Sequence, residues 1–192
     1  MIETGFGPVG VGICADNHVS EFPSVLHRHD VALVLMPHAS PMPYRTSRVV
    51  SEADIAGIVE KTLAVPGLYA DLLGIPVVFV NAVGPMSPMT GLLGRLMTPE
   101  SFRLRGFSRL VDPDGTVRGE LGEEEGVVTA GVTMDPSQKR FRTPPDHDGW
   151  VHPGSRLTRR VVVPFDVAVG RLAYAASRER RQLAVGEAQR RP

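Results

Sequence analysis

The order of apolar segments in this 192-residue chain predicts a mixed α/β fold, in which the strands of a sheet alternate with helices. Two apolar runs, Val9–Cys14 and Val31–Met36, are separated by a segment with helical character, which is the spacing of a strand–helix–strand unit. A third apolar run, Ile75–Val80, follows the clearest helical pattern of the chain. Further along, RLVDPDGTVRGEL is typical of a β-hairpin, so the sheet is expected to contain antiparallel strands as well.

The first strand–helix–strand unit begins with VGVGIC, Val9–Cys14, whose glycines indicate close approach by another backbone. The segment Val19–His29 is expected to form a short helix. Ser20 is its expected N-cap, and Pro23 is tolerated only in the first turn. The run Val31–Met36 is continuously apolar, which predicts a strand covered on both faces.

The clearest helix is predicted for Ser51–Leu63, where Ser51 and Asp54 resemble a capping box and apolar residues recur on one face. Pro66-Gly67 is expected to interrupt this helix, with another turn or two over Leu68–Leu73. Gly74 is a natural helix end, because glycine readily adopts the left-handed conformation found there. The apolar strand Ile75–Val80 then leads into Asn81.

The last part of the chain is predicted to be less regular. Residues 85–105 are expected to be irregular, Gly126–Met134 to be a strand after the hairpin, and residues 135–160 to be loop. Asp166–Val185 is expected to form a surface helix, followed by an Arg-rich tail that frays at the terminus. The predicted organisation is one domain over residues 1–160 and a C-terminal extension over residues 161–192.

The composition argues against several classes of partner. Lys plus Arg and Asp plus Glu both number 21, so the net charge of +0 gives no reason to expect nucleic acid or an anionic membrane. No apolar run approaches the ~20 residues that span a bilayer, and the first residues, MIETGFGPVG, do not resemble a secretory leader. With one cysteine there is no internal disulfide, and a cytoplasmic location is expected. No pattern predicts a cofactor.

The single cysteine, Cys14, lies where an apolar strand meets a polar turn, and two interpretations are open. A free cysteine is commonly a small packing residue of the core. Alternatively, a strand-to-turn junction would lift the sulfur to the edge of the sheet, where a partly exposed thiolate acts as a nucleophile. The backbone N–H of Ala15 would then help to stabilise an oxyanion, and Asp16 would orient the turn or simply form an Asx turn.

Histidines provide further candidates near the thiol. His18 and His38 flank the cysteine region and are candidate pocket residues, because a Cys–His pair can activate a thiol. The sequence HRH, His27–His29, does not predict a metal site, since adjacent helical positions do not share a face and no partner has ligand spacing. The DPDG sequence lacks the rest of a calcium loop and is interpreted as a turn. No metal site is therefore predicted.

Several motifs in order resemble those of the carbon–nitrogen hydrolase, or nitrilase, superfamily. In that family a strand ends in Ile-Cys-x-Asp, a Phe-Pro pair starts the next helix, and an apolar strand closed by proline follows. A later strand ends in Asn and Gly, and a Gly-x-Ser…Asp-Pro-x-Gly hairpin comes next. The matching residues, within about Gly10–Asp135, are Ile13 to Asp16, Phe22-Pro23, Val31 to Pro37, Asn81, Gly84, Gly106, Ser108 and Asp112 to Gly115.

The resemblance implies a fold and an activity. It implies a nitrilase-like α-β-β-α sandwich that is incomplete, with the N-terminal half missing, so an N-terminally truncated member is expected. It implies a hydrolase of carbon–nitrogen bonds other than peptide bonds, with Cys14 as the nucleophile and a covalent acyl-enzyme intermediate. Asn81 joins His18 and His38 as a candidate pocket residue. The expected partners are a small amide or nitrile substrate and further copies of the chain in a homo-oligomer.

The sequence departs from the family in its catalytic residues. The family uses a Glu–Lys–Cys triad whose Glu and Lys precede the cysteine. Here Glu3 is the only acidic residue before Cys14, and both lysines, Lys61 and Lys139, follow it. The resemblance therefore transfers Cys14 alone. Two alternatives stay open: a non-catalytic, truncated pseudoenzyme or partner-dependent subunit, and a Cys–His thiol hydrolase or amidotransferase-like protein.

Overall fold

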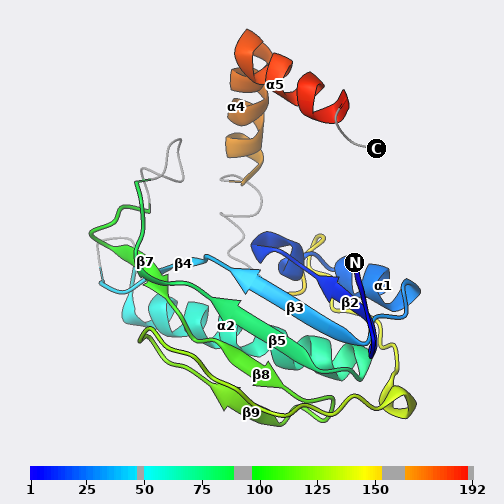
Figure 1. Cartoon of the computed structure of the whole chain (residues 1–192). Helices are drawn as coiled ribbons and strands as arrows, with labels where there is room; N and C mark the ends of the chain where they lie inside the picture. Colours follow the sequence, from blue (N-terminus) through cyan, green and yellow to red (C-terminus); the bar gives the residue numbers. More distant parts are fainter. Residues whose placement is uncertain (47–49, 89–96, 153–162, 190–192) are drawn as a thin grey trace. The chain divides into compact units, whose positions relative to one another are not determined.

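A computed structural model of the chain describes residues 1–46, 50–88, 97–152 and 163–189. Its main feature is a six-stranded sheet in which the strand order is β1-β2-β3-β5-β8-β9 (Figure 1). The strands are β1 (Ile2–Thr4), β2 (Gly7–Val11), β3 (Leu33–His38), β5 (Val77–Asn81), β8 (Arg109–Val111) and β9 (Val117–Glu120).

The strand directions confirm the expected mixed sheet. The three central strands β2, β3 and β5 are parallel, with Val9 opposite Leu33 and Val34 opposite Val77. β1 pairs antiparallel with β2 at one side, and β8 and β9 pair antiparallel at the other. Because parallel strands end at the same edge of a sheet, the residues that follow β2, β3 and β5 come together there.

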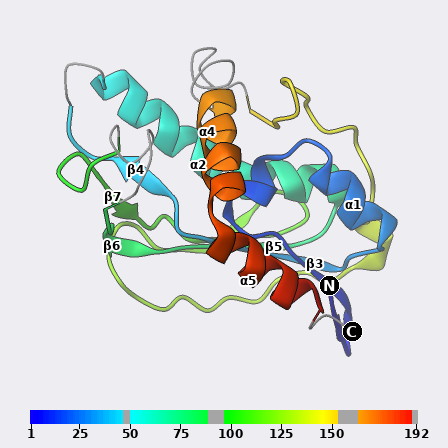
Figure 2. The same cartoon turned by 90° about the horizontal axis from the view of Figure 1, so that it is seen from above.

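One face of this sheet is covered by the long helix α2 (Glu52–Leu73) in both views of the chain (Figures 1 and 2). Along β3 and β5 the side chains alternate, because successive residues of a strand point to opposite faces. The buried side chains of these strands form one hydrophobic core with residues of α1 and α2. Its members are Leu26, Val31, Val34, Met36, Val65, Tyr69, Ala70, Leu72, Leu73, Ile75, Val77, Phe79 and Val111.

The opposite face of the sheet is only partly covered by the described residues. Leu33, Leu35 and Val78 are half-buried there, and Val80 is 53% exposed. The prediction that the apolar run of β3 is covered on both faces is therefore wrong for the described chain. A continuous apolar run shows that both faces are hydrophobic, but it does not provide the elements that cover them.

Helix α2 begins as predicted and is longer than predicted. Ser51 and Asp54 form a capping box, and Gly74 ends the helix in the left-handed conformation with a φ of 64°. Pro66 does not interrupt the helix, contrary to the sequence expectation. It is buried beside Val65 at the core, so packing of this face offsets the cost of ~3 kcal/mol that an internal proline imposes.

The short helix α1 (Phe22–Arg28) carries Pro23 in its first turn, as expected. Its N-cap residue is Glu21 rather than Ser20. The hydroxyl of Ser20 donates instead to the carboxylate of Asp146, and its N–H donates to the carbonyl of Gly149. The long-range contact with residues 146–149 thus replaces the local cap.

A second, three-stranded antiparallel sheet has the order β4-β7-β6, with β4 (Pro41–Pro43), β7 (Phe102–Arg105) and β6 (Val83–Pro85). The segment Pro85–Arg105 was expected to be irregular, but its end forms β7. Residues 89–96 of that segment lie outside the described residues. The small sheet extends directly from the ends of β3 and β5, because β4 and β6 follow them in the chain.

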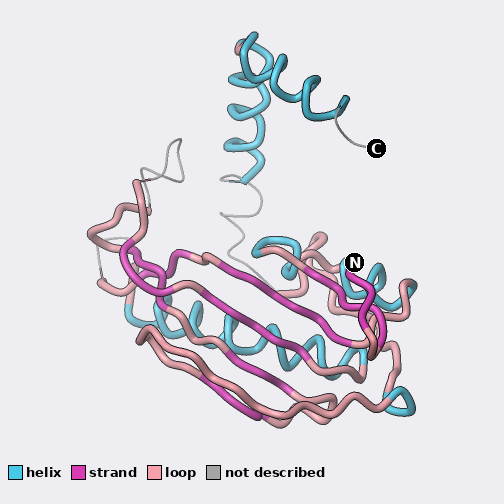
Figure 3. Tube along the Cα trace, in the orientation of Figure 1, coloured by secondary structure: helices cyan, strands magenta, loops and turns pink. Residues whose placement is uncertain are grey.

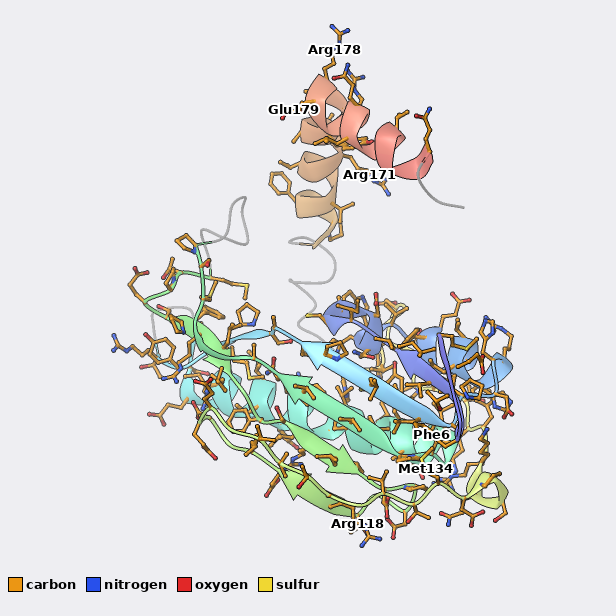
Figure 4. The ribbon with its side chains drawn as sticks, viewed as in Figure 1. Phe6, Arg118, Met134, Arg171, Arg178 and Glu179 are labelled. Atoms are coloured by element: carbon orange, nitrogen blue, oxygen red, sulfur yellow. The ribbon has the colours of Figure 1, made fainter. Side chains whose placement is uncertain are left out.

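The hairpin β8–β9 is confirmed, whereas Gly126–Met134 is loop and not a strand (Figure 3). This segment lies against β9, near Gly119, without a ladder of backbone hydrogen bonds. The N–H of Thr133 donates to the buried carboxylate of Asp112 instead. The 3₁₀ turn η2 (Pro136–Gln138) follows, and Met134 and Phe6 line the same small hollow at one end of the sheet (Figure 4).

The C-terminal helices belong to a second compact unit of the chain. The single helix expected over Asp166–Val185 is divided into α4 (Val163–Ala176) and α5 (Arg178–Gln189). The N–H of Ser177, between them, donates to the carbonyls of Ala173 and Tyr174, so the last turn of α4 closes there. The final residues of the expected Arg-rich tail, 190–192, lie outside the described residues.

Within the described ranges, no helix combines the length and the apolar character needed to cross a membrane.

Candidate active site at Cys14

Cys14 occupies a sharp turn directly after strand β2. The N–H of Gly12 still donates to the carbonyl of Leu35 on β3, and Cys14 then begins the short 3₁₀ helix η1 (Cys14–His18). Its φ is 50°, in the left-handed region that a side-chain-bearing residue adopts only at a cost of ~1–2 kcal/mol. The residue is half-buried, so the thiol is neither sealed in the core nor fully in water. A positive φ at a half-buried residue directly after a parallel strand resembles the backbone geometry of a nucleophile elbow.

Gly12 explains why the approach to this turn is rich in glycine. A Cβ atom built on Gly12 would lie 2.1 Å from Oδ1 of Asn17 and 2.4 Å from the ring of Phe22. Both atoms belong to packed side chains, so even alanine would displace the turn that carries Cys14. The glycine therefore allows η1 to fold back onto the strand.

Asp16 fixes the turn from the solvent side. Its carboxylate accepts a 3.0 Å hydrogen bond from the N–H of Ile13, while its own N–H donates to the carbonyl of Ile13 at 3.1 Å. This is the turn-orienting contact that the sequence suggests for Asp16. Ala15, the first residue after the thiol, is exposed. The role of both residues in stabilising an oxyanion stays a prediction.

A serine that follows strand β3 faces the thiol. Oγ of Ser40 lies 3.7 Å from Sγ of Cys14, within hydrogen-bond distance for sulfur. The same Oγ lies 3.1 Å from Nδ1 of His38. On the other side of the imidazole, Nε2 of His38 lies 2.9 Å from Nδ2 of Asn17, which also donates to the carbonyl of Gly12 at 2.7 Å. The four side chains form a continuous hydrogen-bonded row that ends at the sulfur.

Asn81, at the end of β5, holds this row in place. Its Oδ1 accepts a 3.1 Å hydrogen bond from the N–H of Ser40, and its Nδ2 donates to the carbonyl of Gly106 at 2.7 Å. The backbone N–H of Asn81 donates to the hydroxyl of Ser108. Asn81 is 4% exposed, so these bonds lie in a nearly dry environment where each unsatisfied group would be costly.

His38 is also one of three imidazoles that lie near one another. The rings of His18 and His38 lie 5.7 Å apart edge to face, and those of His18 and His152 lie 6.5 Å apart. Burial, with a smaller contribution from His18, lowers the pKa of His38 to about 4. Burial, and next the charge of His152, lowers the pKa of His18. Both rings are therefore neutral at pH 7.

The third histidine, His152, comes from a distant part of the sequence that we call the strap, residues 146–152. The N–H of Val151 donates to the carbonyl of His18 at 2.9 Å, and Trp150 forms an antiparallel bridge with Val19. Burial, followed by the charges of Lys61 and His147, lowers the pKa of His152. The strap thus forms one wall beside η1.

The structure groups most, but not all, of the residues that the sequence singles out. Cys14, Ala15 and Asp16 share the turn, and His38 and Asn81 approach it through Ser40. In the described part of the chain, neither His18 nor His38 has a direct hydrogen bond to the thiol. The Cys–His pair suggested by the sequence is therefore replaced by an arrangement in which Ser40 lies between sulfur and imidazole.

Sequence reasoning missed Asn17 and Ser40. Ser40 follows β3 by two residues, and the carboxyl ends of neighbouring parallel strands meet, so its position was an available signal. Asn17 had no such signal, because its side chain turns inward only through the 3₁₀ geometry of η1 and is completely buried there.

The residues that the sequence offers for a Glu–Lys pair are Glu3, Lys61 and Lys139. Glu3 is an exposed residue of the edge strand β1, and Nζ of Lys139 is held by the carboxylate of Asp30 at 2.8 Å. Lys61 lies on α2. The described residues contain no cluster of three or more His, Cys, Asp or Glu able to hold a metal ion.

Comparison with solved structures finds 56 similar chains, and the following three are among them. A carbon–nitrogen hydrolase from Helicobacter pylori G27 matches with 17% identity and a TM-score of 0.52, covering 65% of this chain and 39% of that chain. Nit3 of Saccharomyces cerevisiae, of branch 10 of the nitrilase superfamily, matches with 25% identity and a TM-score of 0.42, covering 65% and 37%. An amidase from Nesterenkonia sp. matches with 24% identity and a TM-score of 0.38, covering 62% and 36%.

The first of these similarities supports the fold, and all three matches span less than two fifths of the longer protein. A search of curated protein sequences finds no match. The carbon–nitrogen hydrolase family model matches residues 1–139, which include the elbow at Cys14, the row through Ser40 and His38, and the hairpin β8–β9. On this match, together with the nitrilase-like sheet, the chain belongs to the carbon–nitrogen hydrolase family.

Proposed function

We propose that this chain carries the nucleophile of a hydrolase that cleaves carbon–nitrogen bonds other than peptide bonds, and that the nucleophile is Cys14. The observation that supports this most directly is the left-handed conformation of the half-buried Cys14 after β2, with its sulfur facing a hydroxyl. A cysteine that only packs has no need of a strained backbone. A strained backbone at the cysteine is better explained if it holds the thiol in position to react with a substrate.

The chemistry follows the ordinary course of thiol catalysis. The thiolate of Cys14 attacks the carbon of an amide and forms a C–S bond, the C–N bond breaks, and the nitrogen leaves as ammonia or an amine after gaining a proton. Water then attacks the thioester, which releases the acid and returns the thiol. A nitrile would first give a thioimidate by the same attack. The proposed substrates are therefore small amides or nitriles.

The family's Glu and Lys must come from outside the residues that surround Cys14 here. We propose that they are supplied by another polypeptide segment, either further sequence or a partner chain, and that the chain works in a homo-oligomer in the cytoplasm. The sheet face that includes the 53% exposed Val80 is suited to such association, because exposed apolar surface of this kind favours a covering partner.

A second function is favoured by one observation. Lys139 is paired with Asp30, and Glu3 lies on an exposed edge strand, so these two residues do not form a base and cation at the thiol. A non-catalytic, partner-dependent subunit fits this arrangement. The third alternative, a Cys–His thiol hydrolase or amidotransferase-like protein, would require proton transfer through Ser40, since both ring nitrogens of His38 are already hydrogen-bonded.

Alkylation and turnover separate these functions. The purified 192-residue chain would be treated with iodoacetamide at pH 7 and analysed by intact mass, where the single cysteine makes the product unambiguous. Ammonia release from a panel of small amides and nitriles would be measured in parallel. Turnover that disappears in Cys14→Ala supports the hydrolase, and rapid alkylation without turnover supports the partner-dependent subunit. Slow alkylation, no faster than that of a free cysteine peptide, together with no turnover, would refute the proposed nucleophile.

A further inference from the structure

The side-chain amide of Asn17 has one possible orientation. The atom that lies 2.7 Å from the carbonyl oxygen of Gly12 must be a donor, because a carbonyl oxygen only accepts hydrogen bonds. That atom is therefore Nδ2. The same Nδ2 lies 2.9 Å from Nε2 of His38, and its second hydrogen is free to point there. Asn17 is completely buried, so no water can substitute for either partner.

The orientation of Asn17 fixes the protonation of His38. Since Nδ2 donates to Nε2, that ring nitrogen is an acceptor and carries no proton. A neutral imidazole has one proton, which must then be on Nδ1. Nδ1 lies 3.1 Å from Oγ of Ser40 and donates to it. His38 is 7% exposed and packs against the ring of Phe79 at 4.5 Å, which disfavours a second proton on the ring.

The direction of hydrogen-bond donation continues from Ser40 to the sulfur of Cys14. Oγ of Ser40 already accepts a hydrogen bond from His38, and the backbone of Ser40 is held by Oδ1 of Asn81. The hydroxyl proton is therefore available for the remaining neighbour, Sγ of Cys14, at 3.7 Å. A thiolate accepts such a bond more strongly than a thiol does, because hydrogen bonds to ionised groups are the stronger ones.

We propose that Asn17, His38 and Ser40 form a one-directional hydrogen-bond relay that directs the Ser40 hydroxyl at Cys14 and stabilises its thiolate. Ser40 contacts the reacting atom, whereas Asn17 and His38 are positioning residues that fix the direction of its proton. The inference rests on the proposed function only in treating Cys14 as the nucleophile. It assigns His38 a role other than general base, because its one proton faces Ser40 and its lone pair faces Asn17.

The charged and titratable groups near His38 are consistent with a neutral relay. On η1 the nearest is His18, edge to face with His38, and His18 is in turn followed by His152 of the strap. On β5 the neighbours are Phe79 and Asn81, which do not titrate. Burial and the proximity of His18 hold the pKa of His38 at about 4. The relay therefore keeps one direction across neutral pH.

The main test is the pH–rate profile for alkylation of Cys14 by iodoacetamide in the full chain. Ser40→Ala is expected to slow alkylation at pH 7 by about tenfold and to move the midpoint of the profile upward by about one pH unit, as loss of a hydrogen bond to a charged group predicts. Ser40→Thr, which keeps the hydroxyl, should stay within about threefold of the wild type. Ser137→Ala, which removes an exposed hydroxyl in η2, is the matched control. An unchanged profile in Ser40→Ala would overturn the relay.

The tautomer of His38 can be read without any variant. Long-range ¹H–¹⁵N correlation spectra of the wild-type chain should show His38 protonated at Nδ1 and unprotonated at Nε2 throughout pH 5.5–8. Protonation at Nε2 in this range would refute the assigned direction. As a second check, His38→Asn retains an amide donor near the position of Nδ1, and it should preserve more of the alkylation rate than His38→Leu does.

These readouts separate the relay from the proposed function. The relay is tested by the chemistry of the thiol alone, and the hydrolase by release of ammonia. If turnover is absent but Ser40→Ala shifts the alkylation profile, the relay stands and the catalytic proposal is weakened. If turnover is present and requires Cys14 while Ser40→Ala changes neither measurement, the hydrolase stands and the relay is wrong.

Discussion

The N–H of Ser40 donates a hydrogen bond of 3.1 Å to Oδ1 of Asn81, a residue 41 positions further along the chain. The contact joins the ends of the parallel strands β3 and β5, and it places the Ser40 hydroxyl beside the sulfur of Cys14. The candidate site is thus assembled by backbone and amide groups that never touch the thiol themselves.

Asn81→Asp should weaken this assembly. The carboxylate can still accept from Ser40, but it cannot donate to the carbonyl of Gly106, which lies 2.7 Å from Nδ2 in the wild type. We expect the free energy of unfolding to fall by about 1–3 kcal/mol, the cost of a buried unsatisfied polar group. Urea denaturation at pH 7 measures it, and an unchanged midpoint would contradict the assignment of the Asn81 hydrogen bonds.

Cys14→Gly and Cys14→Ala should differ in stability even though both remove the sulfur. Glycine adopts a φ of 50° without strain, whereas alanine retains a Cβ and the strain with it. We expect the glycine variant to be the more stable by about 1 kcal/mol. Thermal unfolding of the two variants side by side provides the measurement. An alanine variant as stable as the glycine variant would argue against a strained elbow.

Two glycines of the α2 region provide a matched pair. At Gly74, a Cβ would lie 1.9 Å from the carbonyl oxygen of Gln138 and the φ is 64°, whereas a Cβ at Gly57, inside the helix, would meet nothing within 4 Å. Gly74→Ala should therefore destabilise the chain by more than about 1 kcal/mol, and Gly57→Ala should stabilise it by about 0.5–1 kcal/mol. Opposite shifts of the urea midpoint are expected; shifts of the same sign would contradict the helix end at Gly74.

Asp112 should contribute stability that disappears in acid. Burial opposes ionisation of this carboxylate, but hydrogen bonds from Thr133 and Arg118 outweigh it and hold the pKa of Asp112 below its ordinary value of 3.8. Because the folded-state pKa is depressed, the contribution is complete above pH 3.8 and is lost as the pH falls through the folded-state value.

Asp112→Asn should accordingly cost about 1–3 kcal/mol at pH 7. The difference from the wild type should shrink below about pH 4. Urea midpoints at pH 7, 5, 4 and 3 test this, and a difference that is constant over the series would show that the charge of Asp112 does not contribute.

His38 should make the free energy of unfolding depend on pH in a different range from Asp112. Its pKa is lowered to about 4 in the folded chain, mainly by burial, so the unfolded chain binds the proton more readily between that value and 6.5. Stability should therefore decrease as the pH falls from 6.5 towards 4. In His38→Asn, which cannot titrate, the decrease should be smaller. Urea midpoints at pH 7, 6, 5 and 4.5 provide the comparison, and equal slopes in the two proteins would count against a buried neutral histidine.

Local sequence signals predicted the elements whose stability is local. The capping box of Ser51 and Asp54, the glycine end at Gly74 and the Pro-Asp-Gly hairpin all depend on neighbouring residues, and all are present. Where tertiary contacts decide, the predictions were wrong. Pro66 stays inside α2, where its face of the helix is buried, and Gly126–Met134 is loop, with the N–H of Thr133 bonded to Asp112.

The candidate site shows the same division. The position of Cys14 after a strand could be derived from its neighbours. His38 was indicated as a histidine near the cysteine region, and Asn81 by the resemblance to the family. The position of Ser40 after β3 was a usable signal, but its role was not, and Asn17 gave no signal at all. Both residues act through the one atom that each offers to a partner, and residue type alone does not show the direction of a hydrogen bond.

The strap has a consequence for how the chain matures. Trp150 and Val151 pair with Val19 and His18, so the backbone contacts beside the turn at Cys14 are complete only after residues 146–152 have been synthesised. Because the entropy of closing a long loop is lost before its contacts form, we expect the strap to dock late in folding. Since Trp150 is the only tryptophan, its fluorescence should report this final step directly, and the thiol should become reactive at the same moment.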